Sequence, residues 1–212
     1  MKIKKLGHCC LVIETNGRRV MTDPGSYTVD EQSEEKNIDL ILITHEHGDH
    51  LHIESLKKIL KNNRNIKIIT NMGVGKLLDE VGIKYEVLKN NIPEQILGVE
   101  IEAHNCKHEE IYEEYGQVQN TGFFIDKKLF YPGDSFYNPG KPIEILALPV
   151  AGPWTRIKDF IKYGLEVKPK VCFPVHDGGL KSSELTYKLA KMFLTGSGII
   201  FKNFEGNREE EF

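Results

Sequence analysis

The sequence predicts an α/β protein with two mixed β-sheets and helices on their outer faces. Segments with strand-like and helix-like patterns alternate along the chain, which is typical of sheets covered by helices. The strand-like segments also cluster in hairpins, whereas a doubly wound sheet places a helix between most strands. No fixed-period repeat or low-complexity linker interrupts the 212 residues, so we expect one domain over residues 1–212.

The first strands are marked by a turn and by an apolar run. Asn16-Gly17 separates two short apolar segments, at 11–14 and 18–22, and such a dipeptide is a strong hairpin signal. An earlier short strand is expected at 3–6. The fully apolar run 40–43 predicts a strand that is buried on both faces.

The remaining elements follow from apolar spacing and turn residues. In chain order we expect a helix over 52–62, a strand over 66–69, a helix over 74–81, strands near 84–88, 95–103, 121–126 and 128–131, a strand over 143–150, a helix over 155–164, a strand over 171–175, a helix over 182–194 and a strand over 199–201. The acidic tail 205–212 is expected to be frayed.

Composition excludes several classes of protein. Hydrophobic residues make up 40% and charged residues 28%, which is ordinary for a globular chain. The net charge of −3 lacks the basic excess of a nucleic-acid-binding protein, and no apolar run approaches the roughly 18 residues of a membrane span. Four cysteines without CxxC spacing, and no signal-peptide pattern, predict free thiols in the cytoplasm.

Four of the eight histidines fall within eight residues, directly after the apolar run 40–43. The segment reads Thr-His-Glu-His-Gly-Asp-His over 44–50, and His52 follows it. A loop at the carboxyl end of a buried strand is where ligands collect in α/β proteins. Imidazoles and a carboxylate at this density suit a site for borderline divalent metals.

This segment resembles the signature of the metallo-β-lactamase superfamily, and the resemblance extends over nearly the whole chain. Its further parts are Met-Thr-Asp-Pro at 21–24, Ala-His at 103–104, Tyr-Pro-Gly-Asp-Ser at 131–135 and Pro-Val-His at 174–176. Gly7-His8 and Asn-Thr-Gly-Phe at 120–123 are similar to the compact branch that contains L-ascorbate-6-phosphate lactonase. The resemblance implies a four-layer αβ/βα sandwich with a two-metal site between the edges of its sheets.

The resemblance also implies the ligands. His45, His47 and His104 would hold metal 1, Asp49, His50 and His176 would hold metal 2, and Asp134 would bridge them. Two cations about 3.5–4 Å apart can share a hydroxide nucleophile and polarise the bond that it attacks. The resemblance further gives Asp49 a catalytic role, holding the nucleophilic water and taking its proton. Zinc is the first expectation, and manganese, iron or nickel would also accept these ligands.

Some of these positions have competitors or a simpler interpretation. His108 competes with His104 for the third place at metal 1; we favour His104 because it directly follows the alternating apolar run 99–103. Asp23 is expected to orient a ligand, although it could be a turn former before Pro24.

Three residues are candidates for the pocket. They are His8, Trp154 and Arg156, the last as the partner of an anionic substrate group. The segment 105–120, with four glutamates, is either a solvated helix or a wall over the metals.

The sequence therefore predicts a metal-dependent hydrolase that acts on a small ester, lactone or phosphoester. The partner is expected to be a small molecule rather than a nucleic acid or a membrane, and a homo-oligomer is left open. Two enzymatic alternatives share the motif: a nuclease of the same superfamily, and a mononuclear iron redox enzyme. A metal-binding scaffold without turnover is the non-enzymatic alternative.

Overall fold

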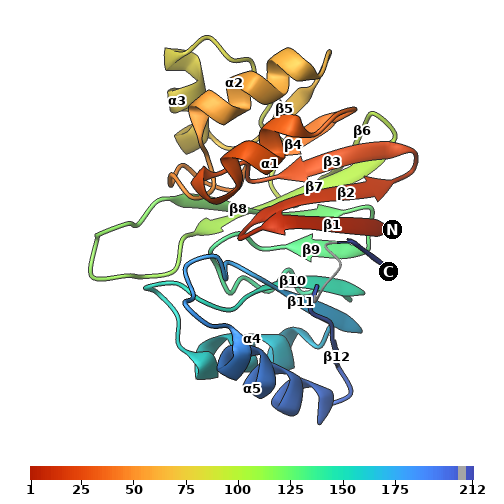
Figure 1. Cartoon of the computed structure of the whole chain (residues 1–212), viewed down its shortest axis with the longest axis vertical. Helices are drawn as coiled ribbons and strands as arrows, with labels where there is room; N and C mark the ends of the chain where they lie inside the picture. The colour runs from red at the N-terminus through yellow and green to blue at the C-terminus, as the bar shows by residue number, and fades with distance from the viewer. Residues whose placement is uncertain (205–208) are drawn as a thin grey trace.

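Two β-sheets lie face to face in the computed structural model, which describes residues 1–204 and 209–212 (Figure 1). The first sheet has the order β13-β1-β2-β3-β4-β5 and the second the order β12-β11-β10-β9-β8-β7-β6. The strands of the first sheet are β1 (Lys2–Gly7), β2 (Cys10–Thr15), β3 (Arg18–Thr22), β4 (Leu40–Leu42), β5 (Lys67–Ile69) and β13 (Glu209–Glu211). Those of the second are β6 (Pro93–Ile96), β7 (Val99–Lys107), β8 (Gln119–Ile125), β9 (Leu129–Tyr131), β10 (Ile145–Pro149), β11 (Val171–Val175) and β12 (Ile200–Phe201). Both sheets mix parallel and antiparallel pairs.

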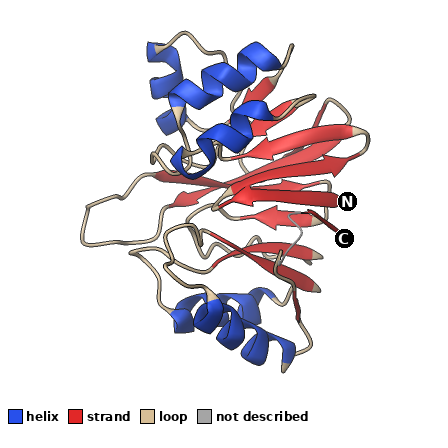
Figure 2. Ribbon diagram, in the orientation of Figure 1, coloured by secondary structure: helices blue, strands red, loops and turns tan. Residues whose placement is uncertain are grey.

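Helices cover the outer face of each sheet (Figure 2). The first sheet carries α1 (Val29–Glu34), which follows the 3₁₀ turn Ser26–Thr28, together with α2 (Ile53–Asn62) and α3 (Met72–Glu80). The second sheet carries α4 (Ile157–Val167) and α5 (Glu184–Thr195). The expected sandwich of two mixed sheets between helices is confirmed. In the described residues, no helix is long and apolar enough to cross a membrane.

Three apolar layers hold these elements together. Side chains such as Leu11, Ile101 and Phe123 fill the space between the sheets and are fully buried. Separate clusters join each sheet to its helices, around Leu56 under α2 and around Phe160 under α4. Each side chain of this size contributes roughly 1.5–3 kcal/mol when buried, so the layers fix the positions of the loops at the sheet edges.

Most expected elements form, but two expectations in the middle of the chain are wrong. The strand expected at 95–103 is a hairpin of β6 and β7, because Leu97 and Gly98 take positive φ values of 52° and 87° and reverse the chain. β7 also continues to Lys107. The strand expected near 84–88 is reduced to one bridge between Glu86 and Ile69, at the open edge of the first sheet.

The tail also differs from its expectation. Residues 205–208 lie outside the described residues, but Glu209–Glu211 forms β13, antiparallel to β1. Lys2 pairs with Glu209 at 2.6 Å, so the acidic tail complements the basic first strand. The tail is therefore an edge strand of the first sheet over its described part.

A tight backbone contact positions the histidine-rich loop. Gly25 follows β3 and packs against the backbone of Asp49: a Cβ atom at Gly25 would lie 1.7 Å from the Asp49 carbonyl oxygen. Ser26 N–H donates to Gly48 O at 2.9 Å, and His52 N–H donates to Pro24 O at 2.9 Å. The segment after β3 thus supports the loop after β4.

We expect Gly25→Ala to lower the free energy of unfolding by about 2–3 kcal/mol, because the added methyl group forces the two backbones apart. Gly48→Ala is the matched control, since a Cβ there meets open space. Urea unfolding followed by circular dichroism measures both. Equal stability of the two variants would contradict the contact.

Candidate metal centre

The loop between β4 and α2 carries three of the histidines into the space at the edges of the two sheets. β4 is completely buried, so its carboxyl end is fixed, and the loop leaves it at Ile43. His52 ends the loop as the N-cap of α2: its Nδ1 accepts a hydrogen bond from Ser55 N–H at 3.2 Å. His52 is therefore a helix cap and not part of the cluster.

A first group of imidazoles consists of His45, His47 and His108. One ring nitrogen of each lies within 4.8 Å of the others. The ring centroids of His47 and His108 are 4.7 Å apart, and those of His45 and His108 are 5.0 Å apart. Three imidazoles that converge in this way can hold one divalent cation.

The structure corrects the choice of His104 as the third member of this group. His104 lies on β7 and packs edge-on against Phe130, in the apolar layer beneath α4. Its neighbour Ala103 faces the layer between the sheets, and successive side chains of a strand point to opposite faces. His104 therefore points away from the site. His108 lies just beyond the end of β7, where the chain is free to turn inwards.

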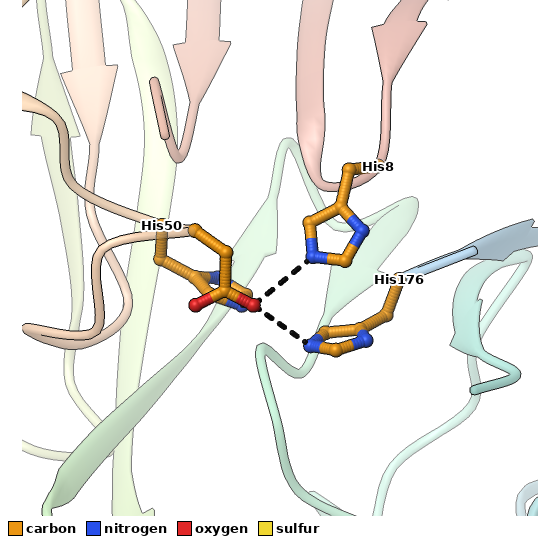
Figure 3. A group of neighbouring side chains, drawn as sticks. His8, His50 and His176 are labelled. Carbon is orange, nitrogen blue, oxygen red and sulfur yellow. Dashed lines mark hydrogen bonds and ion pairs between the residues drawn. The ribbon is translucent and has the colours of Figure 1, made fainter. Parts of the chain in front are cut away.

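A second group lies beside the first and contains Asp49, His50 and His176, with His8 next to them. Figure 3 shows one carboxylate group, that of Asp49, joined by dashed lines to the rings of His8 and His176. His50 Nε2 is 3.8 Å from the same carboxylate oxygen. His176 Nε2 is 3.4 Å from Asp49 Oδ2. The group draws on β1, the histidine-rich loop and the end of β11, which are far apart in the sequence.

Asp134 lies between the two groups. Its Oδ2 is 3.2 Å from His108 Nε2 and 2.8 Å from His176 Nε2, and its Oδ1 is 3.2 Å from His50 Nε2. One carboxylate thus touches imidazoles of both groups, which is the position that a ligand shared by two cations needs. Trp154 Nε1–H also donates to Asp134 Oδ2, at 3.2 Å.

Buried atoms without partners test whether this set fits a metal. Within the described residues, seven buried side-chain atoms have no hydrogen bond of good geometry, and four of them lie together here: His45 Nε2, His50 Nε2, His176 Nε2 and Asp134 Oδ1. The other three, Arg19 Nε and the two ring nitrogens of His104, lie outside the site. An unsatisfied buried polar atom costs about 1–3 kcal/mol, so four in one place need a compensating ligand. The donor set of imidazole and carboxylate suits zinc, manganese or iron.

On His45, His50 and His108 the Nδ1 atom is hydrogen-bonded, so Nε2 is the ring nitrogen left for the site. Thr44 Oγ1–H donates to Asp23 Oδ2 at 2.7 Å, so this hydroxyl accepts from His45 Nδ1–H at 3.0 Å. His50 Nδ1–H donates to Asp23 Oδ2 at 2.7 Å, and His108 Nδ1–H donates to Glu109 O at 2.6 Å. The Nε2 atoms of all three rings are therefore left to face the site, where a metal could bind them in place of a proton. Asp23 occupies the orienting position expected for it.

The electrostatics of the site match this hydrogen bonding. Burial and the neighbouring His50 hold the pKa of His45 well below its ordinary value, so the ring is neutral. Burial by itself would raise the pKa of Asp134, but His50 and His176 outweigh it and hold that pKa well below its usual range. Asp134 is thus an anion at neutral pH, as a metal ligand must be. Burial would lower the pKa of His50 and His176, but Asp134 outweighs it and holds both pKa values well above the ordinary value, so a metal would displace a proton from each ring.

His8 orients Asp49 and is not itself a ligand. Gly178 N–H donates to His8 Nδ1 at 3.1 Å, so the ring proton sits on Nε2. His8 Nε2–H then donates to Asp49 Oδ2 at 3.2 Å and has no lone pair for a metal. The His176 N–H donates to His8 O at 3.1 Å, and both residues take a positive φ, 48° and 60°.

Of the two remaining candidate pocket residues, Trp154 lines the cavity and Arg156 does not. Trp154 is buried and borders the cavity over both groups, which has a volume of about 690 Å³. The expectation that Arg156 lines this cavity is wrong: its Nε–H donates to Asp159 Oδ2 at 2.9 Å, and its side chain is 74% exposed. Cys9 was missed, because no spacing marks it; it lies within 4.8 Å of ligand atoms of His50 and Asp134.

Comparison with known proteins agrees with the fold and the motif. Residues 2–176 match the family model described as Beta-lactamase superfamily domain. The chain therefore belongs to the beta-lactamase superfamily.

Similar proteins occur in bacteria and archaea. A UPF0173 protein of Pyrococcus abyssi is 30% identical over 189 residues, which are 84% of each chain. A second protein of that archaeon, named UPF0173 metal-dependent hydrolase, is 27% identical over 193 residues, 83% of this chain and 84% of its own. A crystal structure from Parabacteroides distasonis has a TM-score of 0.76 and 27% identity, and covers 95% of this chain and 91% of that one.

We expect His108→Ala to bind one divalent cation fewer per chain than the unchanged protein, because the first group loses a ligand. His104→Ala is the control and should retain the full metal content. Elemental analysis of purified protein measures both, after circular dichroism has shown that each variant is folded. Loss of metal from His104→Ala alone would contradict the assignment.

For His8→Ala we expect metal affinity at the second group to fall about 10–100-fold, because Asp49 loses the donor that orients it. Competition titration against a chelating dye measures this. His52→Ala is the matched control: it removes a helix cap worth about 1 kcal/mol of stability and should leave metal affinity unchanged. A His8→Ala variant with native affinity would remove the orienting role.

Proposed function

We propose that this chain is a metal-dependent hydrolase that uses two divalent cations on a small ester or lactone. One observation carries the proposal: Asp134 contacts His108 of the first group as well as His50 and His176 of the second. If the site held a single cation, one of the two groups of converging side chains would have no metal to bind. The family membership and the relatives named as metal-dependent hydrolases support the same conclusion.

Bound cations would supply two things: a polarised substrate carbonyl and a water molecule of lowered pKa. The chain supplies the rest. His45, His47 and His108 would hold one cation, and Asp49, His50 and His176 the other. Asp134 would belong to both and fix their separation.

Asp49 is the more exposed of the two carboxylates that line the cavity. Its side chain is 29% exposed, against 2% for Asp134, and it borders the cavity. The bond from His8 leaves it one well-defined orientation. We assign to Asp49 the task of holding the attacking water and accepting its proton.

The described residues favour this function over the two enzymatic alternatives. The loop 108–118 beside the cavity carries four glutamates and no lysine or arginine, which opposes a polynucleotide. Seven convergent imidazole and carboxylate ligands exceed what a mononuclear iron site needs. The two features oppose the nuclease and the mononuclear iron redox enzyme, respectively.

Asp49→Asn tests the function, because the amide keeps the shape of the side chain and loses its charge. We expect kcat for ester or lactone hydrolysis to fall about 10²–10⁴-fold while the protein stays folded. Chelator treatment of the unchanged protein should abolish turnover, and zinc or manganese should restore it. Turnover that survives both treatments would overturn the proposal.

A further inference from the structure

The cavity wall beyond the metal-site residues is mainly apolar. It is formed by Ile111 and Tyr115 of the loop between β7 and β8 and by Pro153 and Trp154 of the loop between β10 and α4. Its volume of about 690 Å³ lies in the range of small-molecule sites, roughly 300–1,000 Å³. A substrate whose reacting bond lies at the cations would place its other end between these side chains.

This wall offers no partner for a second anionic group. Among the described residues that line the cavity, none is Lys or Arg. The nearest positional candidate, Arg156, is bound to Asp159, and the same carboxylate accepts from Arg156 N–H at the start of α4. The helix N-terminus, an ordinary site for phosphate, therefore already holds a carboxylate of its own chain.

The loop 108–118 adds negative charge near this wall, although its glutamates do not line the cavity themselves. It carries Glu109, Glu110, Glu113 and Glu114, and Glu109 Oε1 is held beside the site by Phe136 N–H at 2.9 Å. Figure 1 shows the loop, between β7 and β8, extending beyond the edges of the sheets. An anionic group at the far end of a substrate would meet repulsion and lose hydration without gaining a partner.

The loop 108–118 holds the apolar side chain of Ile111 in the cavity wall. Glu109 N–H donates to Asp134 O at 2.9 Å at its base, and Tyr115 N–H donates to Tyr112 O at 2.9 Å near its tip. Gly116 has φ 74°, and a Cβ there would lie 2.7 Å from Ile111 Cδ1, so Ile111 packs over this glycine. Tyr112, the next residue along, does not line the cavity.

We propose that the cavity selects an uncharged substrate with a hydrophobic group, and that Ile111 on the loop 108–118 determines this selectivity. The proposal rests on the proposed hydrolase function and narrows its substrate class. Anionic character at the reacting end is tolerated, because the cations lie there. The selection acts on the opposite end, and it excludes phosphorylated or carboxylated substrates that need a second ionic contact.

Trp154 provides a direct test of binding, because it is the only tryptophan of the chain and it lines the cavity. The probes are anisole and 4-methoxybenzenesulfonate, which share a ring and an ether, are not hydrolysed, and differ by one charge. A sulfonate is a weak metal ligand, so it does not compete for the cations. On metal-loaded protein we expect Trp154 fluorescence to report at least about fivefold tighter binding of anisole.

Two loop variants separate contact from long-range charge. Ile111→Lys should shift the affinity ratio by about fivefold toward the sulfonate, because it places a cation in the wall. Tyr112→Lys adds the same charge one residue away, outside the cavity, and should leave the ratio unchanged. Equal shifts in the two variants would overturn the role of Ile111.

Hydrolysis of phenyl acetate and 4-acetoxybenzenesulfonate keeps the two proposals distinguishable. If neither ester is hydrolysed but anisole still binds preferentially, the ester hydrolase assignment fails and the selectivity stands. If both esters are hydrolysed with equal kcat/KM and both ethers bind equally, the function stands and the selectivity is overturned. If neither ether binds, the selectivity is also overturned.

Discussion

The buried carboxylate of Asp23 is the interaction on which the site depends. It accepts hydrogen bonds from Thr44 N–H, Thr44 Oγ1–H, His50 Nδ1–H and Tyr131 Oη–H, each at 2.7 Å. Asp23 follows β3 of the first sheet and Tyr131 ends β9 of the second, so one carboxylate joins the two sheets. Four donors offset the cost of burying it completely. Through Thr44 it also sets the tautomer of His45, and so fixes ligands in both groups.

Asp134 has the complementary role on the other sheet. It lies after β9, in the turn that begins with Gly133, where a Cβ would lie 2.4 Å from Asn120 Oδ1. Asn120 Oδ1 also accepts from Asp134 N–H at 3.2 Å. The first sheet therefore delivers the imidazoles of the histidine-rich loop, and the second delivers the carboxylate that they share. Neither sheet contains a complete site, which explains why the chemistry sits between their edges.

The surroundings of the site are as specific as its ligands. Trp154 donates a hydrogen bond to Asp134 and also forms part of the apolar wall. One side chain therefore positions a metal-site carboxylate and lines the substrate cavity. The loop 108–118 likewise supplies His108 at its base and Ile111 in its wall. Because one segment provides a ligand and a wall, changes that alter specificity in this loop will also affect the first group of imidazoles.

The sequence by itself determined the class of fold, the hairpin at Asn16-Gly17 and the dense histidine loop after β4, because these depend on local pattern and on a contiguous motif. It also indicated Asp23, Asp134 and His176, which follow strands. The choice between His104 and His108 needed the true end of β7 and the alternation of its faces, and a one-residue change of parity reverses where a side chain points. The pairing of Arg156 with Asp159 is instead a local contact between the N-cap and the third residue of α4. Pairing of the tail with β1 was likewise decided only by tertiary structure. β1 and β13 lie at opposite ends of the chain, so no local spacing could predict that they pair.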